Sequence, residues 1–127
     1  MSKGKTTKTD IAALDKLIEE ILVDAYGDDE QYSAFQVILE DGVELPSAGW
    51  VIGEPVSLVA WEYDGNERRG VTARCRRKNG AEYVVSAWEV ELPETAGGAR
   101  YLPAYRRWLG LEPFPNAKGT TGIKRGA

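Results

Sequence analysis

The side chains that could do chemistry in this sequence are carboxylates gathered in the first third of the chain. Between Asp10 and Glu44 there are eleven acidic residues and one basic residue, Lys16. From Ala96 to the end there are six basic residues and one acid, Glu112, and the net charge of all 127 residues is −4. Such a concentration of carboxylates is typical of a solvated helical face or of a surface that binds cations or a basic partner.

Residue types that many enzymes need are missing. The sequence has no histidine and one cysteine, Cys75. Serine–histidine and cysteine–histidine nucleophile systems are therefore excluded, and the commonest zinc ligand is absent. Adjacent carboxylates such as Asp28 and Asp29 could transfer protons, but no nucleophile or phosphate-binding loop accompanies them. We expect a protein that is not an enzyme, with Cys75 as a thiol of the core.

Two amphipathic helices are predicted to position the carboxylates. The first begins near residue 9 and ends at Gly27, and its apolar residues recur at spacings of three and four. The second is expected over residues 28–42, with a capping box formed by Asp28 and Gln31. Its apolar face carries Tyr32, Phe35, Ile38 and Leu39.

Strand and turn signals replace the helical pattern from Trp50 onward. Short strands are predicted at residues 54–63, 67–77, 81–85 and 88–92. In the second strand, Val71, Ala73 and Cys75 share the inner face, and Asn79-Gly80 favours a hairpin with a type I′ turn. This pattern predicts a small SH3-like antiparallel β-barrel, followed by a C-terminal helix over residues 98–109.

The expected organisation is therefore a single α+β domain over residues 9–111, with two N-terminal helices, the β-barrel and the C-terminal helix. Residues 1–8 are expected to be a flexible leader and residues 112–127 a disordered basic tail. No apolar run approaches the roughly 20 residues of a membrane helix, and the polar segment 1–9 lacks the apolar core of a signal peptide. We expect a cytoplasmic protein with no membrane partner.

Several carboxylates fall at predicted helix ends. Asp28 and Asp29 begin the second helix, where the helix dipole stabilises negative charge. Glu40 and Asp41 end that helix, and Asp24 lies near the end of the first, where a negative charge costs about 0.3–1 kcal/mol. A bound cation would remove this cost.

The chain around Gly42 offers only oxygen ligands, which suit a hard cation such as Ca²⁺. The last carbonyls of a helix lack intrahelical partners, and Glu44 follows Glu40 and Asp41 closely. The EF-hand pattern is absent, since residues 24–29 do not match it. On these residues alone, a solvated surface and a cation site both remain open.

Three segments of the sequence resemble a known family. They are residues 19–31 (Glu-Glu-Ile-Leu-Val-Asp-Ala-Tyr-Gly-Asp-Asp-Glu-Gln), 39–46 (Leu-Glu-Asp-Gly-Val-Glu-Leu-Pro) and 53–56 (Gly-Glu-Pro-Val). Together they resemble the CcbP-like family of small, cyanobacterial-type calcium-binding proteins. The resemblance implies a bacterial protein with an acidic two-helix part and a compact β-domain. It also implies a calcium-buffering or calcium-sensing role without catalysis.

By position, the resemblance implies that calcium is bound by surface carboxylates. The candidate Ca²⁺ ligands are Asp24, Asp28, Asp29, Glu40, Asp41 and Glu44. The basic stretch 74–78 and the basic tail differ from a uniformly acidic calcium buffer.

An alternative interpretation is a small β-barrel module that binds RNA or a protein partner through an arginine-rich strand face. This face carries Arg68, Arg69, Arg74, Arg76, Arg77 and Lys78. Trp61 and Tyr63 lie in the neighbouring strand and could stack on bases. The simpler explanation is that the arginines pair with glutamates across the sheet while the tryptophans lie in the core. The negative net charge makes a nucleic-acid partner unlikely, and docking of a protein partner on the helices remains open.

Overall fold

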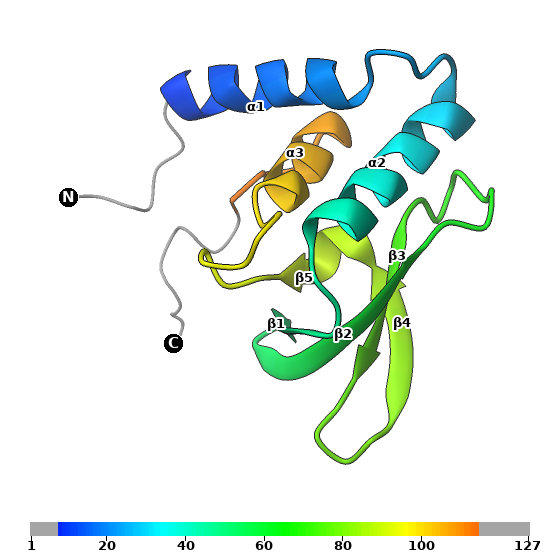
Figure 1. The fold of residues 1–127 in the computed structure, drawn as a ribbon, viewed down its shortest axis with the longest axis vertical. Coiled ribbons are helices and arrows are strands. Elements are labelled where there is room, and N and C mark those ends of the chain that lie inside the picture. The colour runs from blue at the N-terminus through cyan, green and yellow to red at the C-terminus, as the bar shows by residue number, and fades with distance from the viewer. Residues whose placement is uncertain (1–7, 115–127) are drawn as a thin grey trace.

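The computed structural model describes residues 8–114 of the chain. Its elements are α1 (Lys8–Ile21), α2 (Asp28–Gly42), β1 (Ser47–Val51), β2 (Glu54–Glu62), β3 (Thr72–Arg76), β4 (Glu82–Ser86), the 3₁₀ turn η1 (Ala87–Glu89), β5 (Val90–Glu91) and α3 (Tyr101–Trp108). The helices gather at one end of the molecule and the strands at the other (Figure 1). The predicted α+β class is confirmed.

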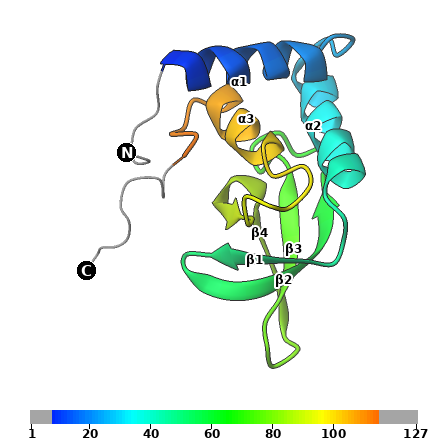
Figure 2. The ribbon, with the colours of Figure 1, turned by 60° about the vertical axis from the view of Figure 1, so that its left-hand side comes forward.

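The five strands form one sheet in the order β4-β3-β2-β1-β5, and every neighbouring pair is antiparallel. The sheet is open, with β4 and β5 at its two edges, so the predicted barrel is not confirmed (Figure 2). The physical reason is the shortness of β5, which pairs only with Trp50 and Val51 of β1 and continues from the η1 turn.

The core lies between the sheet and the helices and contains the faces that the sequence pattern predicted. Phe35 and Leu39 of α2 are fully buried, as are Val71, Ala73 and Cys75 around β3. The ring of Phe35 lies 5.1 Å from the rings of both Tyr105 and Trp108 in α3. Burial of each such large apolar side chain stabilises the fold by roughly 1.5–3 kcal/mol. Burial also raises the pKa of the Cys75 thiol, which fits a core role.

The helix ends differ from the prediction. α1 ends at Ile21, and Gly27, with φ +89°, comes directly before α2 instead of ending α1. The predicted capping box is wrong, because Asp28 is already the first helical residue and the cap is Gly27. The carboxylate of Glu30 instead accepts a hydrogen bond from the backbone N–H of Tyr26, at 2.8 Å.

The two tight hairpins also differ from the prediction. The β3–β4 hairpin is confirmed, but Asn79 lacks the positive φ of a type I′ turn, since Ile52 is the sole non-glycine residue with positive φ among residues 8–114. Ile52 and Gly53, with φ +49° and +78°, instead form the two-residue loop between β1 and β2. The strand predicted over residues 67–77 starts only at Thr72, because the preceding residues turn back onto the carbonyl of Asn66.

A buried guanidinium joins α3 to the sheet edge and to the chain after α3. Arg106 is 5% exposed. Its Nε donates to the Trp88 carbonyl at 2.9 Å, its Nη1 to the Pro113 carbonyl at 3.0 Å, and its Nη2 to the Val90 carbonyl. Burial lowers its pKa. Pro113 is itself buried, whereas residues 115–127 of the predicted tail and nearly all of the predicted leader lie outside the described residues.

Replacing Arg106 by methionine is expected to lower the free energy of unfolding by about 3 kcal/mol, because buried carbonyls would lose their donors. Arg107 is the matched control, since it is exposed and forms an ion pair with Asp15 at 2.9 Å. Arg107→Met is expected to change stability far less. Urea unfolding of both variants measures the difference, and equal losses would contradict the role given to Arg106.

Replacing Ile52 by asparagine is expected to raise the free energy of unfolding by about 1 kcal/mol. A β-branched residue is strained at positive φ, whereas Asn-Gly is the preferred pair for a type I′ turn. Ile52 is 90% exposed, so no burial is lost. The control is Val84→Asn on the extended strand β4, which should lower stability. Thermal unfolding measures the stability of both variants. A change in the same direction for both would contradict the proposed strain at Ile52.

Candidate functional site

Helix α2 separates the six predicted Ca²⁺ ligands into two groups. It has 15 residues, and at 1.5 Å per residue Asp28 and Glu40 are about 18 Å apart along the axis. One ion cannot contact both ends of the helix. The group at its start is Asp24, Asp28 and Asp29, and the group at its end is Glu40, Asp41 and Glu44. All six side chains are exposed.

The group at the start of α2 already has protein partners. The carboxylate of Asp29 accepts a hydrogen bond from the hydroxyl of Tyr63, at 2.7 Å, which connects α2 to the chain after β2. Desolvation and this hydrogen bond raise the pKa of Tyr63. The unpaired backbone N–H groups of the first helical turn add positive potential. Negative charge is therefore favourable at this end without a bound ion.

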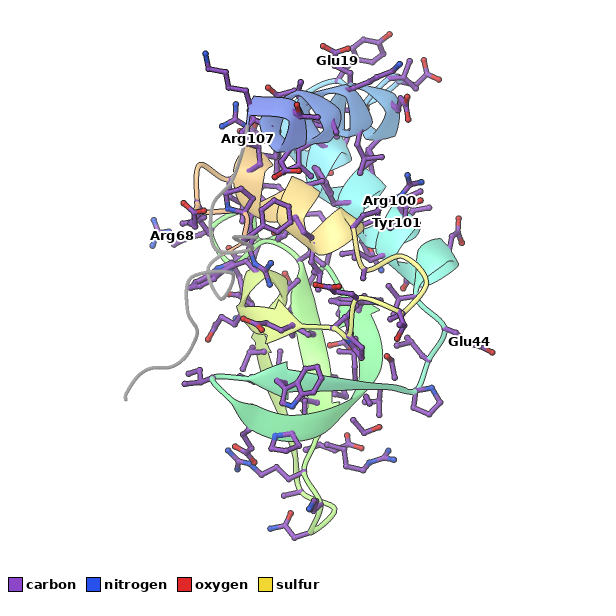
Figure 3. The ribbon with its side chains drawn as sticks, turned by 90° about the vertical axis from the view of Figure 1, so that its left-hand side faces the viewer. Glu19, Glu44, Arg68, Arg100, Tyr101 and Arg107 are labelled. Atoms are coloured by element: carbon purple, nitrogen blue, oxygen red, sulfur yellow. The ribbon has the colours of Figure 1, made fainter. Side chains whose placement is uncertain are left out.

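The group at the end of α2 lies in a less favourable field. The last turn of α2 contains no basic residue, and the carbonyl end of the helix dipole repels carboxylates. Glu40 accepts a hydrogen bond from the side-chain amide of Gln36 at 3.0 Å. Glu44 projects from the chain just after the helix (Figure 3).

A hollow of about 480 Å³ adjoins this end of the helix. Its oxygen-bearing side chains are those of Glu44, Ser47 and Thr95, and its other lining residues are Val43, Leu45, Pro46, Ala48, Ala96 and Gly97. One wall stays close to the helix because Gly98, with φ +79°, has no side chain. A Cβ atom there would meet the Gly42 carbonyl at 2.6 Å. Carboxylate, hydroxyl and carbonyl oxygens are the ligand types that hard cations prefer.

The structure does not gather the carboxylates into a preformed cage. Within residues 8–114 no group of three or more aspartate, glutamate and cysteine side chains is placed to hold a metal ion. Sequence reasoning missed Ser47, Thr95 and Tyr63 as neighbours of the carboxylates. Tyr63 and Asp29 are 34 residues apart in the chain, and no local pattern could have indicated their contact.

Three of the six basic residues of the arginine-rich face are paired with glutamates. Arg74 pairs with Glu62 at 3.2 Å and Arg76 with Glu82 at 2.8 Å. Arg77 pairs with Glu54 at 2.8 Å, and its guanidinium lies 4.3 Å from the centre of the Tyr83 ring. Pairing across the sheet was the simpler explanation of this face, and it holds for these three arginines. Among the tryptophans, Trp61 is buried, whereas Trp50 and Trp88 are 39% and 41% exposed.

Two solved structures share this fold. One, described as a calcium binding protein in the calcium-binding form, has a TM-score of 0.66 and 16% sequence identity, over 83% of this chain and 96% of that chain. The other, the crystal structure of Anabaena CcbP, also has a TM-score of 0.66, with 18% identity over 88% of this chain and 99% of that chain. The chain thus has the fold that its sequence resemblance implied. No protein-family model and no curated protein sequence matches it.

None of the three helices between residues 8 and 114 is long and apolar enough to cross a membrane.

Stability is expected to fall steeply as the pH rises from about 10 to about 12. Burial raises the pKa of Tyr105 to about 12, above its ordinary value of 10.0, so the folded state favours the neutral phenol. The stability gained is complete below the unfolded-state pKa and is lost as the pH rises through the folded-state pKa. Urea unfolding along this pH range measures the change. A free energy of unfolding that stays constant over this range would contradict it.

Proposed function

We propose that this protein binds Ca²⁺ without an EF-hand and serves calcium buffering or sensing, not catalysis. The observation that carries the proposal is the fold shared over 83% of this chain with a calcium-binding protein in its calcium-binding form. The match to Anabaena CcbP and the acidic segments that resemble its family support the same conclusion. Three arginines of the sheet are paired with glutamates and the net charge of the chain is −4, both of which oppose binding to a phosphate backbone, so RNA binding is not proposed.

The principal site is proposed at the end of α2, with Glu40, Asp41 and Glu44 as its carboxylates. Ca²⁺ takes six to eight oxygen ligands. The remaining ligands can come from the final carbonyls of α2, from the hydroxyls of Ser47 and Thr95 in the hollow, and from water. A cation placed there would also relieve the repulsion between the carboxylates and the negative end of the helix.

A second, weaker site is proposed at Asp24, Asp28 and Asp29. Here the helix dipole and the N–H groups of the first turn already compensate the negative charge and would oppose a cation. Asp29 also has the hydroxyl of Tyr63 as a partner. Calcium would therefore gain less at this end of α2 than at the other.

The double variant Glu40→Gln with Asp41→Asn is expected to weaken calcium binding at the principal site at least about ten-fold, equivalent to about 1.4 kcal/mol. The matched control is Asp28→Asn with Asp29→Asn, which removes the same charge at the opposite end of α2. It should leave the tighter binding step within about two-fold of the native protein. Calorimetric titration measures both. Unchanged affinity in the first variant would show that the principal site is misplaced.

Calcium is also expected to stabilise the native protein more than the Glu40→Gln, Asp41→Asn variant. Without calcium the variant should be more stable, by about 0.3–1 kcal/mol for each charge removed from the negative helix end. At a calcium concentration about 100 times the native dissociation constant, the native protein should gain about 2.7 kcal/mol, whereas a variant that binds ten-fold more weakly should gain about 1.4 kcal/mol. Calcium should therefore shift the stability difference by about 1.3 kcal/mol in favour of the native protein.

Thermal unfolding in chelator and in calcium measures this shift. If calcium raises the melting temperature of both proteins equally, the ion binds outside these two carboxylates.

A further inference from the structure

A shallow groove lies between the end of α1 and the outer face of α2. It consists of two adjoining hollows of about 410 and 340 Å³ that share Ile21, Ser33 and Ala34. The first hollow continues to Asp24 and Glu30, and the second to Glu20 and Val37. In Figure 1, α1 and α2 meet at the loop that joins them, and α1 extends from there across α3.

The groove face of α2 is uncovered and combines acidic, small and apolar residues. Residues three and four apart share a helix face, so Glu30, Ser33 and Val37 lie together, on the side opposite to buried Phe35. Val37 is 52% exposed, and Val23 in the loop beside the groove is 69% exposed. Sheet and α3 bury the face of α2 that carries Phe35, and no described element covers Val37.

The chain segment that forms the groove is acidic. Residues 19–44 contain nine aspartates and glutamates and no lysine or arginine. Three of these acids, Glu20, Asp24 and Glu30, line the groove itself. An apolar floor with an acidic rim is complementary to a helix that carries apolar residues on one face and lysine or arginine beside them.

We propose that this groove binds a basic amphipathic helix of a partner protein. The apolar residues of the partner helix would lie against Ile21, Ala34 and Val37, and its basic residues would face Glu20, Asp24 and Glu30. The small side chains of Ser33 and Ala34 allow a helix to approach closely. A second copy of this chain fits poorly, since a two-fold interface would place two acidic rims against each other.

The proposal does not require bound calcium, although Asp24 of the rim also belongs to the second proposed calcium site. The probe is a synthetic helical peptide of about 18 residues, made of leucine and lysine, with the leucines spaced three and four apart. A scrambled peptide of the same composition is the control for charge. Binding is measured calorimetrically with the full chain in a chelator-containing buffer, so that failure here would leave the calcium proposal untouched.

Two protein variants locate the binding. Val37→Lys places a charge on the groove floor, and Val84→Lys places the same charge on β4, where Val84 is 41% exposed. Both positions are exposed, so both variants should fold, and their melting temperatures check this. Glu20→Lys on the rim provides a second groove variant.

The expected result is saturable one-to-one binding of the amphipathic peptide, with the scrambled peptide at least about ten-fold weaker. Val37→Lys and Glu20→Lys should each weaken binding about ten-fold or more, and Val84→Lys less than about two-fold. Equal binding of both peptides, equal losses in the Val37 and Val84 variants, or no binding would overturn the proposal. Dimerisation of the chain that Val37→Lys abolishes would assign the groove to a second copy and would also overturn it.

Discussion

The architecture depends on one buried charge, the guanidinium of Arg106. Its three hydrogen bonds hold the carbonyls of Trp88, Val90 and Pro113 against α3. The edge strand β5 has two residues and could not hold its place through strand pairing alone. Because Arg106 fixes α3 over this edge, the rings of Tyr105 and Trp108 are in place to pack on Phe35 of α2. The position of α2, which carries the proposed ligands, therefore follows from this contact.

Different faces of helix α2 serve the core and the groove, and its two ends differ in how their carboxylates are stabilised. Phe35 and Leu39 bury one face, while Val37 on another remains exposed beside the groove. At its start, the field of the helix favours negative charge, and the hydroxyl of Tyr63 donates a hydrogen bond to Asp29. At its end, Glu40 accepts a hydrogen bond from Gln36, but the last turn contains no basic residue and the field of the helix opposes negative charge. A cation at that end and a basic helix along the groove would satisfy different carboxylates of the same acidic segment.

The periodicity of the apolar residues predicted the parts of the fold that depend on burial. It did not predict the features that depend on a single contact or hydrogen bond. The apolar spacing of α2 and the alternation of Val71, Ala73 and Cys75 identified core residues, since burial acts on every turn or every second residue. The type I′ loop was expected at Asn79-Gly80 but occurs at Ile52-Gly53, where strand pairing forces a β-branched residue to positive φ. The role of Arg106 could not be predicted, because its acceptors lie 7, 16 and 18 residues away in the chain. For the site, the predicted bounds of α2 already placed Asp28 and Asp29 at one end and Glu40 and Asp41 at the other. The hollow beside Glu44 and the contact between Asp29 and Tyr63 could not be predicted, because they join segments far apart in the chain.

The central claim, that calcium binds at the acidic ends of α2, is tested most directly by isothermal titration of the chelator-treated protein with calcium. The titration is made at physiological salt and repeated in millimolar magnesium, which prefers smaller, octahedral sites. We predict saturable binding in the micromolar range that magnesium does not abolish. A flat titration, or heat that disappears in magnesium, would contradict calcium binding and would leave the carboxylates as a solvated surface.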